Sequence, residues 1–137
     1  MITALDTNIL SALFSNEAVA QDIGQQLGTA GRLGTILISA PVYSEILAHP
    51  TASIVRIDSF LLETRITIDY LHDPQIWLTA GLAYREYAKR RRISEGGEPK
   101  RVLIDFLIGA HASLHADCLL TLDRRRYERD FPELRLK

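Results

Sequence analysis

The sequence is poor in the features that mark secreted and membrane proteins. It has one cysteine, Cys118, so an internal disulfide is excluded and a reducing compartment is favoured. Its longest nearly apolar run, residues 102–112, is too short to span a bilayer and contains Asp105. The amino terminus lacks the basic start and the small-residue cleavage site of a signal peptide. We therefore expect a cytoplasmic protein without a membrane partner.

The sequence also lacks an excess of charge of either sign. Its 16 basic and 17 acidic residues give a net charge of −1, so a polyanionic partner would have to be met by a local basic patch. The 137 residues, 47% of them hydrophobic, suit one globular domain with a real core. We find no linker or repeat, and we expect a single domain over residues 1–137.

Apolar segments without a polar outward face alternate with segments that have helix signals. Such strands are expected where helices cover both faces of a parallel sheet. The pattern predicts a three-layer α/β/α sandwich with a mainly parallel central sheet. The predicted strands are 2–6, 35–40, 65–71 and 118–122, with a last edge strand at 134–136. The predicted helices are 7–14, 15–27, one opening at Pro41, 52–63, one opening at Pro74 with an apolar stripe from Trp77, and 102–116; residues 28–34 are predicted as a loop.

Four acidic residues are predicted to face the carboxyl end of this sheet. Asp6 and Asp123 each follow an apolar strand, at the edge where open parallel sheets form their sites. Glu45 lies in the first turns of the helix after the strand 35–40, and Asp105 lies near the start of a nearly all-apolar helix. Four separate segments could therefore bring their carboxylates together.

Each acid also has a simpler explanation. Helix capping accounts for Asp6 equally well, and Glu45 and Asp123 alone suit solvated helix positions. Asp105 is harder to explain, because an unpaired buried carboxylate is costly; Arg101 could compensate its charge. Together, four such acids repel one another and need a divalent cation, and all-oxygen ligands favour Mg²⁺ or Mn²⁺ over zinc.

The ordered set of acidic motifs resembles that of PIN-domain ribonucleases, and in particular of VapC-type toxins from toxin–antitoxin pairs. The segments LDTNIL, SEI, DFLIGAHA and TLD carry this resemblance, which extends over essentially the whole chain. It implies a PIN-like fold, a metal-dependent endoribonuclease that hydrolyses RNA with a metal-activated water, a homodimer, and a cognate antitoxin protein as partner.

The resemblance also implies a set of site residues. Asp6, Glu45, Asp105 and Asp123 would form the catalytic acidic site, with Asp6, Asp105 and Asp123 holding Mg²⁺ or Mn²⁺. Glu45 would bind the metal or position the attacking water. Thr7 and Thr121 match small hydroxyl positions beside the acids, where they would orient carboxylates; capping and strand packing explain these threonines equally well.

Basic residues cluster on either side of the third and fourth acids. We expect these to contact the RNA backbone, although a charge run is usually only a solvated face. The expected RNA-binding residues are Arg90, Arg91, Arg92, Arg124 and Arg125. The role of the loop 93–101, which departs from the family pattern as an insertion, is not indicated by the motifs.

Two other functions remain open from the sequence. An aspartyl-nucleophile phosphatase also ends its first strand in aspartate, but it normally needs a second aspartate where this chain has Asn8. A non-catalytic PIN-like module for RNA or partner binding would be expected to lose acids, and all four are present. His111 and His115 have the spacing of a helical metal pair, but they fall on a face away from Asp105, which favours a packing role.

Overall fold

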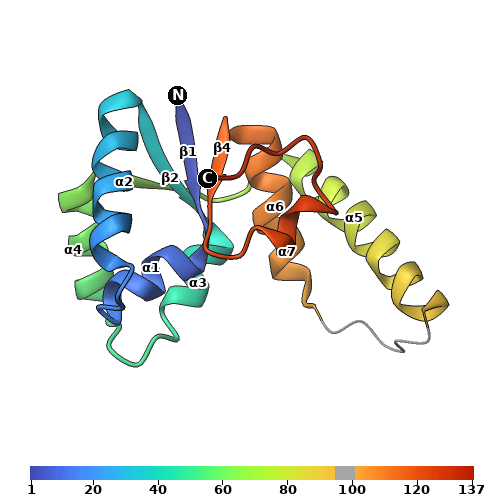
Figure 1. The fold of residues 1–137 in the computed structure, drawn as a ribbon, viewed down its shortest axis with the longest axis horizontal. Coiled ribbons are helices and arrows are strands. Elements are labelled where there is room, and N and C mark those ends of the chain that lie inside the picture. Colours follow the sequence, from blue (N-terminus) through green and yellow to red (C-terminus); the bar gives the residue numbers. More distant parts are fainter. Residues whose placement is uncertain (95–100) are drawn as a thin grey trace.

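The computed structural model describes residues 1–94 and 101–137, and its centre is a four-stranded parallel sheet (Figure 1). The strand order is β3-β2-β1-β4. Thr3 pairs with Ile36 on one side and with Cys118 on the other, so β1 lies in the interior of the sheet. The strands are β1 (Ile2–Leu5), β2 (Thr35–Ser39), β3 (Ile66–Asp69) and β4 (Cys118–Leu120).

Helices cover both faces of this sheet, which confirms the predicted three-layer sandwich. In Figure 1, α2 and α4 lie on one side of the strands and α5 and α6 on the other, while α1 and α3 lie at one end. Within the described residues the helices are α1 (Thr7–Phe14), α2 (Ala20–Leu33), α3 (Ala40–Ile46), α4 (Ile54–Thr64), α5 (Pro74–Ile93), α6 (Leu103–His115) and α7 (Arg125–Glu128). None of them is both long and apolar enough to cross a membrane.

The second helix differs from the sequence prediction at both ends. Asn16 adopts a left-handed conformation (φ 50°) in the turn that ends α1, so it does not start the next helix. The helix α2 begins at Ala20 and continues through the segment predicted as a loop to Leu33. Gly28 and Gly31 suggested a loop, but the packing of buried Ile23 and Ala30 outweighs the weak helix propensity of glycine.

The apolar stripe predicted on α5 is only partly buried. Ile76 and Ala80 are buried, whereas Trp77 is 52% exposed and Leu78 is 55% exposed. The Trp77 indole donates a hydrogen bond to the Leu71 carbonyl, and its ring remains at the surface. The predicted stripe is therefore exposed at Trp77 and Leu78, whereas Tyr84 further along it packs against Phe106 of the core.

The helix α6 forms the centre of the core on its side of the sheet. Residues 106–112 are all buried, including Gly109, whose backbone lies against the ring of Phe131. The last residues of the chain run beside β4: the Leu119 amide donates to the Arg135 carbonyl, and Leu119 and Leu136 form a parallel bridge. The predicted edge strand is thus present as a short parallel pairing.

Candidate active site

Asp6 links the first strand to the first helix and is 1% exposed. Its Oδ1 accepts a hydrogen bond from the Thr7 amide (2.7 Å) and caps α1, while its Oδ2 accepts one from the Thr121 hydroxyl (2.7 Å). Burial raises the pKa of the Asp6 carboxyl, although these hydrogen bonds act to lower it. Within the described residues Asp6 forms no ion pair. Capping, one of the two explanations of Asp6, is therefore real, and it leaves a buried carboxylate with little charge compensation.

Glu45 is brought to Asp6 by the first residue of α1. The Thr7 hydroxyl donates to Glu45 Oε2 over 2.6 Å, which joins α1 to α3. Burial raises the pKa of the Glu45 carboxyl, and the nearby charges of Asp105 and Asp6 add to this effect. Glu45 is thus electrostatically coupled to both acids, which places three of the four predicted residues in one region.

Asp105 and Asp123 are linked by Arg126, which the sequence did not indicate as a site residue. Arg126 Nη1 lies 3.3 Å from Asp105 Oδ1, and Arg126 Nε lies 3.4 Å from Asp123 Oδ2. Burial alone would lower the pKa of Arg126, but the charges of Asp105, Asp6 and Asp123 raise it. The predicted partner Arg101 is also near, with its Nε 3.7 Å from Asp105 Oδ2. Two arginines therefore compensate Asp105.

A hydrogen-bonded turn fixes Asp123 relative to Asp6. The Thr121 hydroxyl, which donates to Asp6, accepts from the Asp123 amide (3.0 Å) and from the Asn8 side-chain amide (3.2 Å). Asn8 Oδ1 accepts in turn from the Leu122 amide. The hydroxyl of Tyr127 is buried close to the Asp6 carboxylate, and their interaction acts to lower the pKa of Asp6. Neither Asn8 nor Tyr127 was expected at the site.

The donor chemistry of this cluster suits a hard divalent cation. Four carboxylates from separate elements face one region, and one of them is buried with a raised pKa. All-oxygen donors of this kind are typical of Mg²⁺ and Mn²⁺ sites. In residues 1–94 and 101–137, however, no three acidic, histidine or cysteine side chains are grouped closely enough to ligate one ion. Arg126 lies between two of the carboxylates.

The five arginines expected to bind RNA have different surroundings. Arg90 pairs with Asp130, whose side chain is 3% exposed, and Arg124 pairs weakly with Glu128 at 3.8 Å. Arg90, Arg91 and Arg125 line a common pocket, whereas Arg92 and Arg124 are not among the residues that line it. Residues 95–100 of the basic loop, Lys100 among them, lie outside the described part of the chain.

His111 and His115 face a second pair of acids instead of the cluster around Asp6. His111 Nε2 lies 3.1 Å from Asp69 Oδ2, and His115 Nε2 lies 2.8 Å from Asp73 Oδ2. Burial lowers the pKa of His111 despite the neighbouring Asp69 charge. These contacts tie α6 to the end of β3 and to the cap of α5, in keeping with the packing role expected for both histidines.

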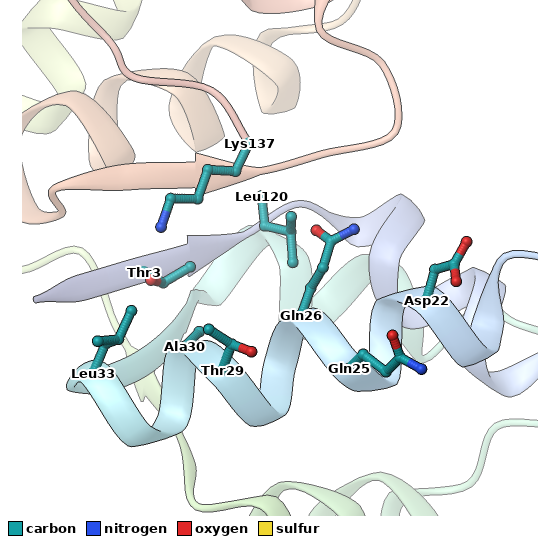
Figure 2. A pocket seen from close by; sticks show the side chains of 9 residues that line it. All are labelled: Thr3, Asp22, Gln25, Gln26, Thr29, Ala30, Leu33, Leu120 and Lys137. Carbon is teal, nitrogen blue, oxygen red and sulfur yellow. The ribbon is translucent and has the colours of Figure 1, made fainter.

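A hollow of about 430 Å³ lies between α2 and the end of the chain. Figure 2 shows Gln26 and Thr29 of α2 on one side, and Leu120 and Lys137 on the other. Among the described residues that line it, Asp22 is the one carboxylate, and none of the four predicted acids contributes. The hollow therefore offers no grouping of acids comparable to that around Asp6.

Solved structures resemble the whole chain at low sequence identity. A chain of VapBC2 from Rickettsia felis, solved bound to a promoter DNA fragment, is 23% identical with a TM-score of 0.67, and the match covers 100% of this chain and 98% of that one. VapBC-1 from nontypeable Haemophilus influenzae matches at 24% identity and a TM-score of 0.68, covering 100% and 97%. A toxin–antitoxin complex from Klebsiella pneumoniae matches at 21% and 0.63, covering 96% and 94%.

Comparison with protein families gives the same fold. No curated protein matches the sequence significantly. The family described as the PIN domain matches residues 3–132, which is nearly the entire chain and includes all four predicted acids. The chain belongs to the PIN-domain family.

Proposed function

We propose that this protein is a metal-dependent endoribonuclease and the toxin of a VapBC-type toxin–antitoxin pair. The observation that carries the proposal is that Asp6, Glu45, Asp105 and Asp123 of a PIN-domain chain lie in one region, linked through Thr7 and Arg126. The similar solved structures are toxin–antitoxin complexes, matched over nearly the full length of both chains, which supports the assignment to a toxin.

In this proposal Asp6, Asp105 and Asp123 hold Mg²⁺ or Mn²⁺. When bound, the ion polarises the scissile phosphate and makes a water molecule more acidic. The protein's own groups orient the acids: Thr121 fixes Asp6 and the Asp123 turn, and Thr7 fixes Glu45. Glu45, whose pKa is raised by burial, would accept a proton from the attacking water.

The same contacts weigh against the two alternative functions. Asn8 stands where a phosphatase would need its acid, and its side chain is engaged with Thr121 and with the Leu122 amide. A non-catalytic module would need Asp6 only as the cap of α1, and the burial of its carboxylate without an ion-pair partner among the described residues costs stability. Burst release from an aryl phosphate would favour the phosphatase, and RNA binding without metal-dependent cleavage would favour the module.

The proposal is tested by RNA cleavage with the metal as a variable. Purified protein should cut cellular RNA in Mg²⁺ or Mn²⁺ and lose this activity in EDTA. Asp105→Asn should be inactive, because it removes a predicted ligand, while Asp22→Asn makes the same chemical change on exposed α2 and should cleave normally. Cleavage that persists in EDTA, or in the Asp105 variant, would contradict the proposal.

Arg126 should compete with the metal for the acids. Because its guanidinium lies within 3.4 Å of Asp105 and Asp123, Arg126→Gln removes a positive charge from the cluster. We expect Mn²⁺ to bind roughly tenfold more tightly, and the melting temperature in EDTA to fall. Arg124→Gln makes the same charge change at an exposed neighbour and should alter Mn²⁺ affinity far less. Weaker Mn²⁺ binding to the Arg126 variant would show that Arg126 assists the metal.

We also propose a homodimer bound by a cognate antitoxin. Large apolar side chains are exposed on α4, where Val55 is 77% and Leu62 is 80% exposed, and on α5 at Trp77 and Leu78. Apolar surface of this kind is common where proteins associate. Light scattering that finds only a monomer at micromolar concentrations would contradict the homodimer.

A further inference from the structure

A second concave site lies beside the acids and is lined mainly by arginine. It is a cavity of about 530 Å³ between the end of α5, Arg101 shortly before α6, and the region of α7. Its charged lining residues are Arg90, Arg91, Arg101, Arg125, Arg129 and Asp130. We call it the arginine pocket. Five guanidinium groups face one carboxylate, so its lining has a strong excess of positive charge.

Two of the arginines form a fixed wall of this pocket. Arg101 Nη1 lies 2.6 Å from Asp130 Oδ2, and Arg90 binds the other oxygen of the same carboxylate. The Arg101 guanidinium also lies 4.4 Å from the centre of the Phe106 ring. The Asp130 side chain is 3% exposed, and its two carboxylate oxygens are bound by these two arginines of the pocket wall.

Two other arginines are available to a ligand. Arg125 and Arg129 are exposed, and neither forms an ion pair with any residue in the described ranges. Arginine presents several donors in one plane, which suits the oxygens of a phosphate group. A concave surface with these two side chains, beside the wall formed by Arg90 and Arg101, is suited to bind a phosphate group.

The arginine pocket adjoins the acidic cluster. Arg101 lies between them, because its Nε is 3.7 Å from Asp105 while its Nη1 binds Asp130. On α7, Arg126 contacts Asp105 and its neighbour Arg125 lines the pocket. At Arg101 the two sites therefore share one guanidinium group. A strand with one phosphate at the acids would bring another phosphate to the pocket.

We propose that the arginine pocket binds a backbone phosphate of the RNA strand that is cut at the acids. This inference rests on the proposed ribonuclease function and specifies where the RNA strand binds. The strand is held on the α5–α7 side of the scissile bond. Arg125 and Arg129 contact the phosphate, while Arg90 and Arg101 shape the site through Asp130. Binding at the pocket needs no metal.

The test is RNA affinity measured against salt concentration for matched double variants. The probe is a fluorescein-labelled single-stranded RNA of mixed sequence, in Ca²⁺ to suppress cleavage. Arg125→Gln with Arg129→Gln should weaken binding about tenfold. It should also make the log–log salt slope shallower by roughly 0.7 if one phosphate contact is lost. Mn²⁺ affinity should not change. Arg32→Gln with Arg85→Gln removes the same charge from surfaces outside the pocket and should keep the wild-type slope.

The possible results distinguish failure of the arginine-pocket proposal from failure of the proposed ribonuclease function. If the Arg125 and Arg129 double variant keeps the RNA affinity and the salt slope of the wild type, the arginine pocket does not bind RNA. This holds even if Mg²⁺-dependent cleavage is present. Equal losses in both double variants would also overturn it, because only the general charge would then matter. If RNA binding depends on the pocket but no cleavage occurs in Mg²⁺, the pocket stands and the nuclease proposal fails. No RNA binding by the wild type overturns both.

Discussion

Replacing Asp6 with asparagine should abolish RNA cleavage and at the same time stabilise the metal-free fold. Removing a residue that only supports a metal ligand typically costs up to about 100-fold in activity. Removing a ligand itself, as in Asp6→Asn, should therefore reduce cleavage by more than this. Stability should rise because Asp6 is 1% exposed and burial raises its pKa, so its ionisation at neutral pH disfavours the folded state. The gain should be about 0.5–2 kcal/mol, the range usual for stabilising substitutions.

The pH dependence of the stability gained by Asp6→Asn tests whether ionisation of the buried Asp6 carboxyl is its cause. A raised folded-state pKa means that the wild type is relatively more stable while Asp6 is protonated, and that it loses this advantage as pH rises through the folded pKa. The difference in melting temperature in EDTA should therefore be larger at pH 8 than at pH 5. Asp123→Asn is the control, because its side chain is 45% exposed and its change should affect cleavage more than stability. If Asp6→Asn is less stable than the wild type at pH 8, the hydrogen bonds of the carboxylate outweigh its burial.

The sequence predicted the position of the acids because that position follows from local pattern. An apolar strand that ends in aspartate, as at Asp6, places the carboxylate at the carboxyl edge of a parallel sheet wherever the helices lie. The layered fold was predictable for a similar reason, since strands without a polar face require cover on both sides. Errors arose where packing outweighed propensity, as in α2, which continues through Gly28 and Gly31.

The partners of the charged residues could not be predicted in the same way. Arg126 belongs to a run of three arginines, and nothing in the run distinguishes the member that turns toward Asp105 and Asp123. Asp130 binds Arg90 and Arg101, which are 40 and 29 residues away in the sequence. Such pairs depend on how α5, α6 and α7 pack, and a single sequence carries no pattern for them.

Gly109 in α6 should be intolerant of even one methyl group. A Cβ atom at this position would lie 2.2 Å from Phe131 Cε2 and 2.5 Å from its Cδ2. Phe131 is 5% exposed, so the ring has little room to move aside. Gly109→Ala should therefore destabilise the protein by about 1–3 kcal/mol or more, as overpacked cores do, even though alanine favours helices.

Thermal or urea unfolding of matched glycine variants measures this effect. Gly81→Ala on α5 makes the same substitution in a helix with nothing within 4 Å of the new Cβ, so it should gain up to about 1 kcal/mol from helix propensity. The two variants should thus shift stability in opposite directions. If the clash with Phe131 is the cause, adding Phe131→Leu to Gly109→Ala should cost less than the sum of the two single changes. Additive losses, or a stabilised Gly109→Ala, would mean that α6 and Phe131 separate at little cost and that the close approach does not require glycine.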